Sequence, residues 1–302
     1  MMHRSAAKTL VALATALTAS GAVLAQTAAA PAADPAPAAT SPLTANISLT
    51  TNYKFRGQDQ DQIGNNGFYK KRGVKPAIQG GFDYAFGDSG FYIGNWNSSV
   101  NWLSGNSIES DIYGGYKFKG GPIDWDVGVL TYIYPGNSNG NTTEVYGAGT
   151  YANEIFGSLT VKYSHTVSKD YFGYAGANSF NPYLDPFNSR PSGRNTGYLN
   201  LSYSKEVIPQ LTLKAAVGYT RMSSDIRAAG YASYVDYSLG GTYDFGGGLS
   251  LTGAVQGANK KDSYRLSTGD GVDLFGDGSF IYGATSQSIN KPRLIVTLTK
   301  TF

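Results

Sequence analysis

The 302-residue chain contains no cysteine, which excludes disulfide scaffolds, thiolate metal sites and cysteine nucleophiles. Charged residues make up only 15% of the chain, and no run of like charge is longer than the three residues from Lys70 to Arg72. Beyond the N-terminus no apolar stretch reaches about 18 residues, so no transmembrane helix is expected. The chain therefore lacks the features of a nucleic-acid-binding protein and of a helical membrane protein.

Glycine and the aromatic residues are abundant instead. The 39 Gly, 12 Pro, 23 Tyr and 14 Phe residues indicate a β-rich chain with many turns.

Residues 1–25 have the pattern of a secretory signal peptide. Arg4 and Lys8 give a positive start, a weakly apolar run follows, and Val23-Leu24-Ala25 forms a small-residue cleavage site. A membrane anchor is disfavoured because the run is shorter than about 18 residues and contains Thr and Ser. Cleavage leaves 22 basic and 21 acidic residues, so the mature chain is close to neutral.

Residues 26–44 form an Ala/Pro-rich linker with little to bury, which predicts a disordered spacer. From Ala45 to the C-terminus the dominant hydrophobic period is two, as in β-strands. In the first segment Ile47 and Leu49 alternate with Ser48 and Thr50. The same rule predicts about twelve strands, at 45–56, 75–86, 90–102, 107–119, 122–134, 142–152, 156–167, 195–206, 210–221, 231–245, 248–258 and 292–302.

The connections between these strands alternate in length. Short Gly-rich turns such as Gly120-Gly121 and Gly246-Gly247 alternate with long loops at 57–74, 168–194 and 259–291. This alternation and the even strand number predict an all-β, antiparallel up-and-down barrel over 45–302, with both termini at one end.

The chemistry of the two strand faces predicts which face points outward and which lines the interior of the barrel. In a soluble, lipocalin-like barrel the apolar face fills the core, but about twelve strands enclose more space than apolar side chains fill. Charged residues on the polar face are costly in lipid. We therefore predict a transmembrane barrel with a polar lumen. Aromatic residues near the strand ends would form interfacial girdles, namely Tyr53, Phe55, Phe82, Tyr84, Phe86, Trp102, Tyr116, Phe118, Tyr203, Tyr219, Tyr243 and Phe245.

The chain ends on Phe302, directly after the alternating stretch RLIVTLTKT. A terminal aromatic residue in this context resembles the C-terminal assembly signal of bacterial outer-membrane barrels, which implies the outer-membrane assembly machinery as a partner. Lys300 departs from that pattern, although a lysine near the rim can extend its ammonium group into lipid headgroups.

Several segments resemble the TorF family of porins from Gram-negative outer membranes. They are LTANISLTTNYKFRGQDQ (43–60), KPAIQGGFDYAFGDSGFYIGNWNSSVNW (75–102), SDIYGGYKF (110–118) and DWDVGVLTYIYPG (124–136), with weaker likeness through residue 204. The resemblance implies an outer-membrane location and a pore, and it supplies no site residues. The insertion at 61–74 is larger than the family pattern.

Strand alternation places a nearly balanced set of charged residues in the lumen, which predicts weak charge selectivity. Lys54/Arg56 and Lys117/Lys119 form a local anion-favouring zone if they share a level, or alternatively pair with acidic residues across strands. The predicted pore-lining residues are Lys54, Arg56, Asp83, Glu109, Asp111, Lys117, Lys119, Asp124, Asp126, Glu144, Lys162, Lys214, Asp236, Asp244 and Arg293.

Two features allow other functions, and neither is favoured. A lipid-acting enzyme would need His165 beside a serine, yet alternation puts Ser164 and His165 on opposite faces, so we predict no enzyme and no cofactor. The stretch at 268–277 partly matches a calcium-binding nonapeptide. Because calcium rolls need several stacked repeats, a solvated Gly/Asp turn is favoured there.

The sequence thus predicts an outer-membrane porin for passive diffusion of small hydrophilic solutes, in contact with lipid and lipopolysaccharide. The alternative is a non-conducting barrel, acting as an anchor, adhesin or loop-presenting scaffold, in which inward side chains or the loop 259–291 close the bore.

Overall fold

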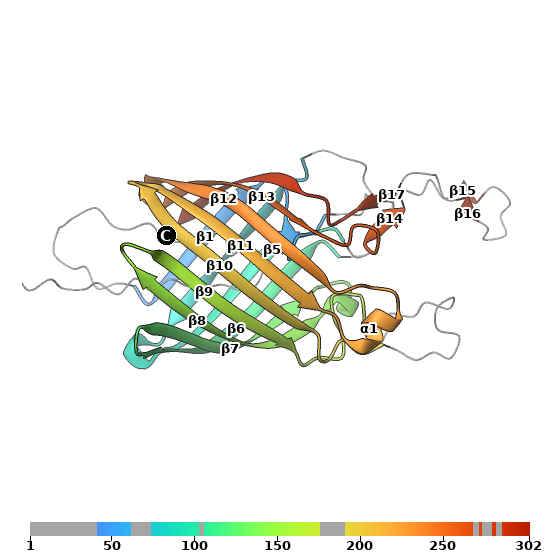
Figure 1. Ribbon diagram of the computed structural model, residues 1–302, viewed down its shortest axis with the longest axis horizontal. Coiled ribbons are helices and arrows are strands. Elements are labelled where there is room, and N and C mark those ends of the chain that lie inside the picture. Colours follow the sequence, from blue (N-terminus) through green and yellow to red (C-terminus); the bar gives the residue numbers. More distant parts are fainter. Residues whose placement is uncertain are drawn as a thin grey trace, which may run out of the picture.

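The computed structural model describes residues 41–61, 74–102, 106–175, 191–267, 272–273, 280–281 and 286–302. The predicted signal peptide and most of the predicted linker lie outside these residues. Within them, twelve antiparallel strands close into a barrel with strongly tilted strands (Figure 1). The predicted all-β, twelve-stranded antiparallel barrel is therefore confirmed.

The wall strands follow one another around the barrel in chain order, and β1 meets β18 to close it. They are β1 (Leu43–Thr50), β4 (Ala77–Ala85), β5 (Phe91–Ser99), β6 (Ile108–Gly120), β7 (Ile123–Ile133), β8 (Thr142–Asn153), β9 (Gly157–Thr166), β10 (Gly197–Ile208), β11 (Leu211–Arg221), β12 (Tyr234–Gly246), β13 (Leu249–Ala258) and β18 (Arg293–Thr301).

The closing pair of strands is held partly by side chains. The register runs from Asn46 opposite Thr301 to Thr50 opposite Thr297. Inside the barrel the Ser48 and Thr299 hydroxyls are 2.8 Å apart, and the Thr297 hydroxyl donates to Thr50 at 2.8 Å. These pairs add cross-strand contacts to a seam whose ladder is short.

The two ends of the barrel differ. The tight turns and the C-terminus lie at one end, which we call the turn end (Figure 1). The other end, the loop end, carries helix α1 (Ser224–Ala228), the 3-10 helix η2 (Ser138–Gly140) and the small strand pairs β14 (Arg265–Ser267) with β17 (Ser286–Ser288) and β15 (Val272–Asp273) with β16 (Phe280–Ile281). A second 3-10 helix, η1 (Gly87–Ser89), forms one of the tight turns.

The barrel wall has an apolar outer face and a polar inner face. On β9, Val161 and Tyr163 are 48% and 49% exposed, whereas Thr160, Lys162 and Ser164 between and beside them are buried. The same alternation holds on the other wall strands, because successive side chains point to opposite faces. Among the described residues, no helix has the length and hydropathy needed to cross a membrane.

The predicted strand ranges agree with the observed ones to within three residues at each end, with one exception. The first strand was expected to continue to residue 56, but β1 starts at Leu43 and ends at Thr50. The chain then leaves the wall, so Tyr53 and Phe55 are buried inside the barrel rather than placed in an outer girdle. Trp102 also lies inside, packed edge-on against Tyr134 with ring centroids 5.1 Å apart.

Candidate functional site in the barrel lumen

The fifteen predicted pore-lining residues occupy two kinds of position. Thirteen lie on wall strands, on the face opposite the exposed apolar side chains. The other two, Lys54 and Arg56, were expected on the first wall strand and instead lie on a short hairpin inside the lumen. This is a correction to the sequence prediction, and its cause is the early end of β1.

The inner hairpin comprises residues 51–61 and contains β2 (Lys54–Phe55) paired with β3 (Gln58–Asp59). Arg56 and Gly57 form its turn, with φ angles of 45° and 76°. Gly57 is required on two grounds, because its φ favours glycine and because a Cβ there would lie 2.5 Å from the Gly257 carbonyl oxygen of β13. The tip thus packs directly on the barrel wall.

Backbone hydrogen bonds hold the hairpin on the side of the barrel from which it departs. Thr51 N donates to Val296 O of β18 at 2.9 Å, and Asp59 N donates to Ile289 O at 3.0 Å. Asn101, just after β5, donates from its backbone N to Gln60 O at 2.9 Å. These anchors lie next to β18, β1 and β5, which are close together in the ring.

On the far side of the lumen the hairpin is held by side chains. Arg56 Nη2 donates to Glu144 Oε2 of β8 at 2.7 Å, and both side chains are 1% exposed. Between β1 and β8 lie four wall strands in one direction and six in the other. The Tyr53 hydroxyl donates to Glu109 Oε1 of β6 at 2.8 Å. The hairpin therefore lies near β18 and β13, and its side chains bridge the lumen to β6 and β8.

A buried cluster of three charges fixes the base of the hairpin. Lys54 Nζ lies 3.1 Å from Asp59 Oδ1, and Arg293 Nε donates to both Asp59 carboxylate oxygens at 3.0 Å. Lys54 Nζ also donates to the carbonyl oxygens of Gly57 and Ile289. Burial lowers the pKa of Lys54 to about 8, although the negative charge of Asp59 opposes this shift.

Aromatic rings fill the lumen around the hairpin at the loop end. Phe55, Tyr132 and Phe172 pack together with ring centroids 4.8 to 5.4 Å apart. Tyr171 and Tyr134 extend this buried cluster. The hairpin thus combines an apolar contact on its loop-end side with ion pairs at its base and tip.

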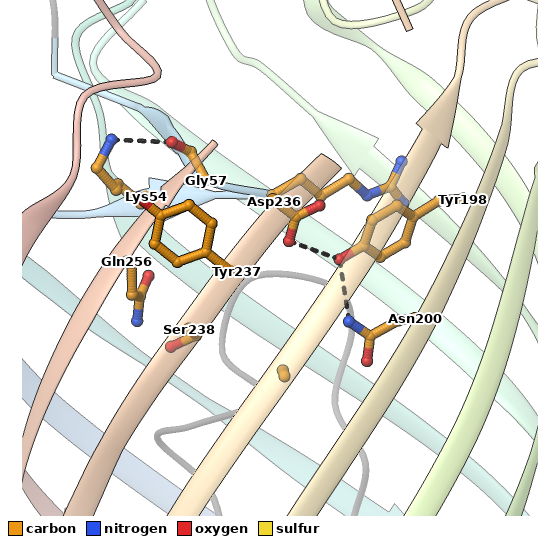
Figure 2. A pocket seen from close by; sticks show the side chains of 10 residues that line it. Lys54, Gly57, Tyr198, Asn200, Asp236, Tyr237, Ser238 and Gln256 are labelled. Carbon is orange, nitrogen blue, oxygen red and sulfur yellow. Dashed lines mark hydrogen bonds between the residues drawn. The ribbon is translucent and has the colours of Figure 1, made fainter. Parts of the chain in front are cut away.

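A pocket lies between the inner hairpin and the wall formed by β10 to β13 (Figure 2). The Tyr198 hydroxyl donates to Asp236 Oδ1 at 3.1 Å and accepts from Asn200 Nδ2 at 3.1 Å. The Arg56 guanidinium carbon lies 4.1 Å from the centroid of the Tyr198 ring. The lining residues are Lys54, Arg56, Gly57, Tyr198, Asn200, Ala216, Asp236, Tyr237, Ser238 and Gln256.

A second polar cluster lies on the wall from β5 to β9. The Tyr92 hydroxyl donates to Asp126 Oδ1 at 2.6 Å and also contacts the Tyr146 hydroxyl. Lys117 Nζ lies 4.6 Å from the Tyr92 ring centroid, and Lys162 Nζ lies 4.1 Å from that of Tyr146. Each lysine is thus stabilised by a cation–π contact with one tyrosine ring.

The basic residues considered for an anion-favouring zone have acidic neighbours. Lys54 and Arg56 form the ion pairs described above, and Lys119 Nζ lies 3.5 Å from Asp124 Oδ1 near the turn end. Lys117 stands directly opposite Asp126 in the β6–β7 register. The structure therefore pairs Lys54, Arg56 and Lys119 with carboxylates and places Lys117 opposite one.

Ser164 and His165, the residues considered for a lipid-acting enzyme, lie on opposite faces of β9. Ser164 is buried on the inner face of β9, whereas His165 is on the outer face, with its Nδ1 3.3 Å from the Tyr163 hydroxyl. The predicted separation of Ser164 and His165 is confirmed.

Most of the stretch 268–277, which partly matches a calcium-binding nonapeptide, lies outside the described residues. Within the described part of the chain, no group of three metal-ligating side chains is brought together.

A family model matches residues 33–302. The chain belongs to the Gcw_chp family. That family is described as a bacterial protein of unknown function. No curated protein matches this Gcw_chp chain.

Several solved structures resemble the Gcw_chp barrel in fold. The KdgM porin has a TM-score of 0.49 at 9% identity, with 86% of this chain and 99% of that chain covered. The NanC porin has a TM-score of 0.49 at 12% identity, covering 86% and 98%. The COG4313 outer membrane channel from Pseudomonas putida F1 has a TM-score of 0.46 at 10% identity, covering 90% and 100%.

Sequence reasoning missed two parts of this site. It missed the inner hairpin, for which the only local signal is the turn-forming Arg56-Gly57 pair followed by polar residues. It also missed the neutral lining residues Tyr198, Asn200 and Gln256, because charge selectivity points only to charged side chains. Strand alternation alone would have placed these three on the inner face.

Proposed function

We propose that this Gcw_chp protein is an outer-membrane channel of the porin type, through which small hydrophilic solutes diffuse passively. The observation that carries the proposal is the closed barrel with an apolar outer face and a charged inner face. A closed barrel leaves no unpaired strand edge in lipid, and charged side chains on the inner face are shielded from hydrocarbon.

The proposed export route follows from both ends of the chain. Residues 1–25 act as a cleaved signal peptide, residues 26–44 as a spacer, and the strand ending at Phe302 as the signal read by the outer-membrane assembly machinery. The resemblance to TorF-family porins supports the same location and class. Outer aromatic residues such as Phe82, Phe118 and Phe245, all exposed, would contact lipid and lipopolysaccharide at the interfaces.

The proposed channel selects weakly by charge. The thirteen charged wall residues and the two on the hairpin include both signs, and several of them form ion pairs. Paired charges leave little net field along the lumen. We propose no catalytic role and no cofactor.

A second function is favoured by one observation, the inner hairpin whose side chains bridge the lumen. If the hairpin stays in place, the barrel conducts poorly and acts as an anchor, adhesin or loop-presenting scaffold. The two functions differ in whether current passes through a correctly folded barrel.

The deciding experiment is a single-channel recording of the mature chain, refolded in detergent and inserted into a planar bilayer. Current steps that scale with salt concentration support the channel, and the reversal potential in a salt gradient measures its selectivity. A folded barrel that shows the mobility shift on heating typical of barrels, and that gives no current, supports the scaffold.

A further inference from the structure

We infer that the pocket between the inner hairpin and β10 to β13 binds a small zwitterion, a solute with one ammonium and one carboxylate group. Arg56 would receive the carboxylate, and Asp236, which is labelled in Figure 2, would receive the ammonium. This inference names a solute class for the proposed channel and in that respect rests on the proposed function.

The first argument is that the pocket carries charged atoms of both signs that have no hydrogen-bond partner among the described residues. Arg56 uses Nη2 for Glu144, while its Nε and Nη1 have no partner. Asp236 uses Oδ1 for the Tyr198 hydroxyl, while its Oδ2 has no partner. Arg56 is 3% exposed and Asp236 is 8% exposed. Unpaired buried charged atoms are costly, so this pocket gains from a ligand that satisfies both.

The second argument is charge balance. Lys54, Arg56 and Asp236 line the pocket. Lys54 pairs with Asp59, which also pairs with Arg293, and Arg56 pairs with Glu144, so the lining residues and the ion pairs connected to them include three charges of each sign. A purely anionic or cationic solute disturbs this balance, whereas a zwitterion preserves it. A polyol of the same size can form hydrogen bonds with Arg56 and Asp236, but only a zwitterion also forms an ion pair with each of them.

The third argument is that the positions of both binding groups are fixed. The Tyr198 ring stacks under the Arg56 guanidinium, and its hydroxyl holds Asp236. The space for this arrangement comes from Gly218 on β11, because a side chain there would collide with the Tyr198 hydroxyl and with Asp236 Oδ2. The two binding groups are thus held by one tyrosine, next to a glycine that leaves room for them.

Four three-carbon probes test the inference: β-alanine as the zwitterion, propionate as the anion, propylammonium as the cation and 1,3-propanediol as the neutral compound. Binding to the refolded mature barrel in detergent is measured by titration calorimetry, which needs no conduction. We expect β-alanine to bind at least about tenfold more tightly than each of the other three. Equal affinities, tighter binding of any other probe, or no binding of β-alanine would overturn the inference.

The variant Asp236→Asn removes the charge and keeps an oxygen that can accept from Tyr198. It should reduce the affinity for β-alanine to that for propionate. Asp244→Asn is the matched control, because Asp244 lies on the same strand and the same inner face near the turn end, and it should leave all four affinities unchanged. If both variants bind like the wild-type chain, the pocket is not the site. If the barrel conducts but these binding tests fail, the zwitterion site is wrong and the proposed channel stands. If the binding tests succeed but the barrel does not conduct, the channel is wrong and the zwitterion site stands.

Discussion

Arg56 and Glu144 are 88 residues apart in the sequence, and their side chains meet across the barrel lumen at 2.7 Å. One belongs to a hairpin anchored by backbone hydrogen bonds beside β18, and the other belongs to the far wall. The hairpin is therefore fixed by its backbone on one side and only by side chains on the other. This asymmetry makes the Arg56 contact the natural place to release the hairpin from the lumen.

Glu144→Gln should loosen the hairpin. It leaves the Arg56 charge buried without a counter-charge, and breaking a buried pair by removing one partner is strongly destabilising. We expect the ratio of open to closed time in single-channel recordings to rise by about tenfold. The matched control is Asp124→Asn, since the Lys119–Asp124 pair is 65% and 59% exposed and should contribute little. Identical recordings from both variants would contradict this role of the Arg56 contact.

Lys54 should make the stability of the barrel depend on pH in a defined window. Its pKa is about 8 in the fold, below the ordinary value of 10.5, so between these values the unfolded chain binds more protons. The free energy of unfolding contributed by Lys54 should therefore rise with pH from about 8 to about 10.5 and be flat below 8. The measurement is the difference in unfolding free energy between the wild-type chain and Lys54→Met across this range. A difference that does not vary with pH would show that the Lys54 pKa is not lowered.

The neighbouring residues Leu201 and Ser202 near the middle of β10 test the assignment of the two faces. Leu201 is 42% exposed on the outer face, and Ser202 faces the lumen. Leu201→Arg should lower the free energy of unfolding in lipid vesicles by about 2–4 kcal/mol, because the guanidinium would face hydrocarbon. Ser202→Arg adds the same group to the inner face and should cost much less. Denaturant titrations of both variants provide the comparison, and equal losses would argue against an outer face in lipid.

Phe302 should matter for assembly in the cell more than for the folded barrel. Its backbone N donates to Ala45 O at 2.9 Å, whereas its side chain is 72% exposed. Phe302→Ala keeps the backbone bond, so the refolded variant should conduct and unfold like the wild-type chain. Its yield in the outer membrane of expressing cells should fall. Phe245→Ala, which truncates an exposed aromatic side chain on the outer face of β12, is the control and should assemble normally.

The strand number, the strand order and the two faces of the wall were predictable from the sequence. Alternation with a period of two is a local property, and a one-residue slip would move a whole apolar face inward, so the pattern specifies the register strongly. Val161, Lys162 and Tyr163 illustrate this, because each lies on the face that its position in the pattern predicts.

The path of residues 51–61 was decided only by the tertiary structure. Tyr53 and Phe55 continue the alternation of β1, and the same pattern fits a wall strand and a hairpin turned into the lumen. Which one forms depends on partners that are distant in sequence, such as Glu144 and Arg293. Barrel closure brings these partners within reach of Arg56 and Asp59. The residues of the charged inner face could therefore be predicted one by one from the sequence. The hairpin and the pocket beside it could not, because they form only when the closed wall supplies ion-pair partners from several strands.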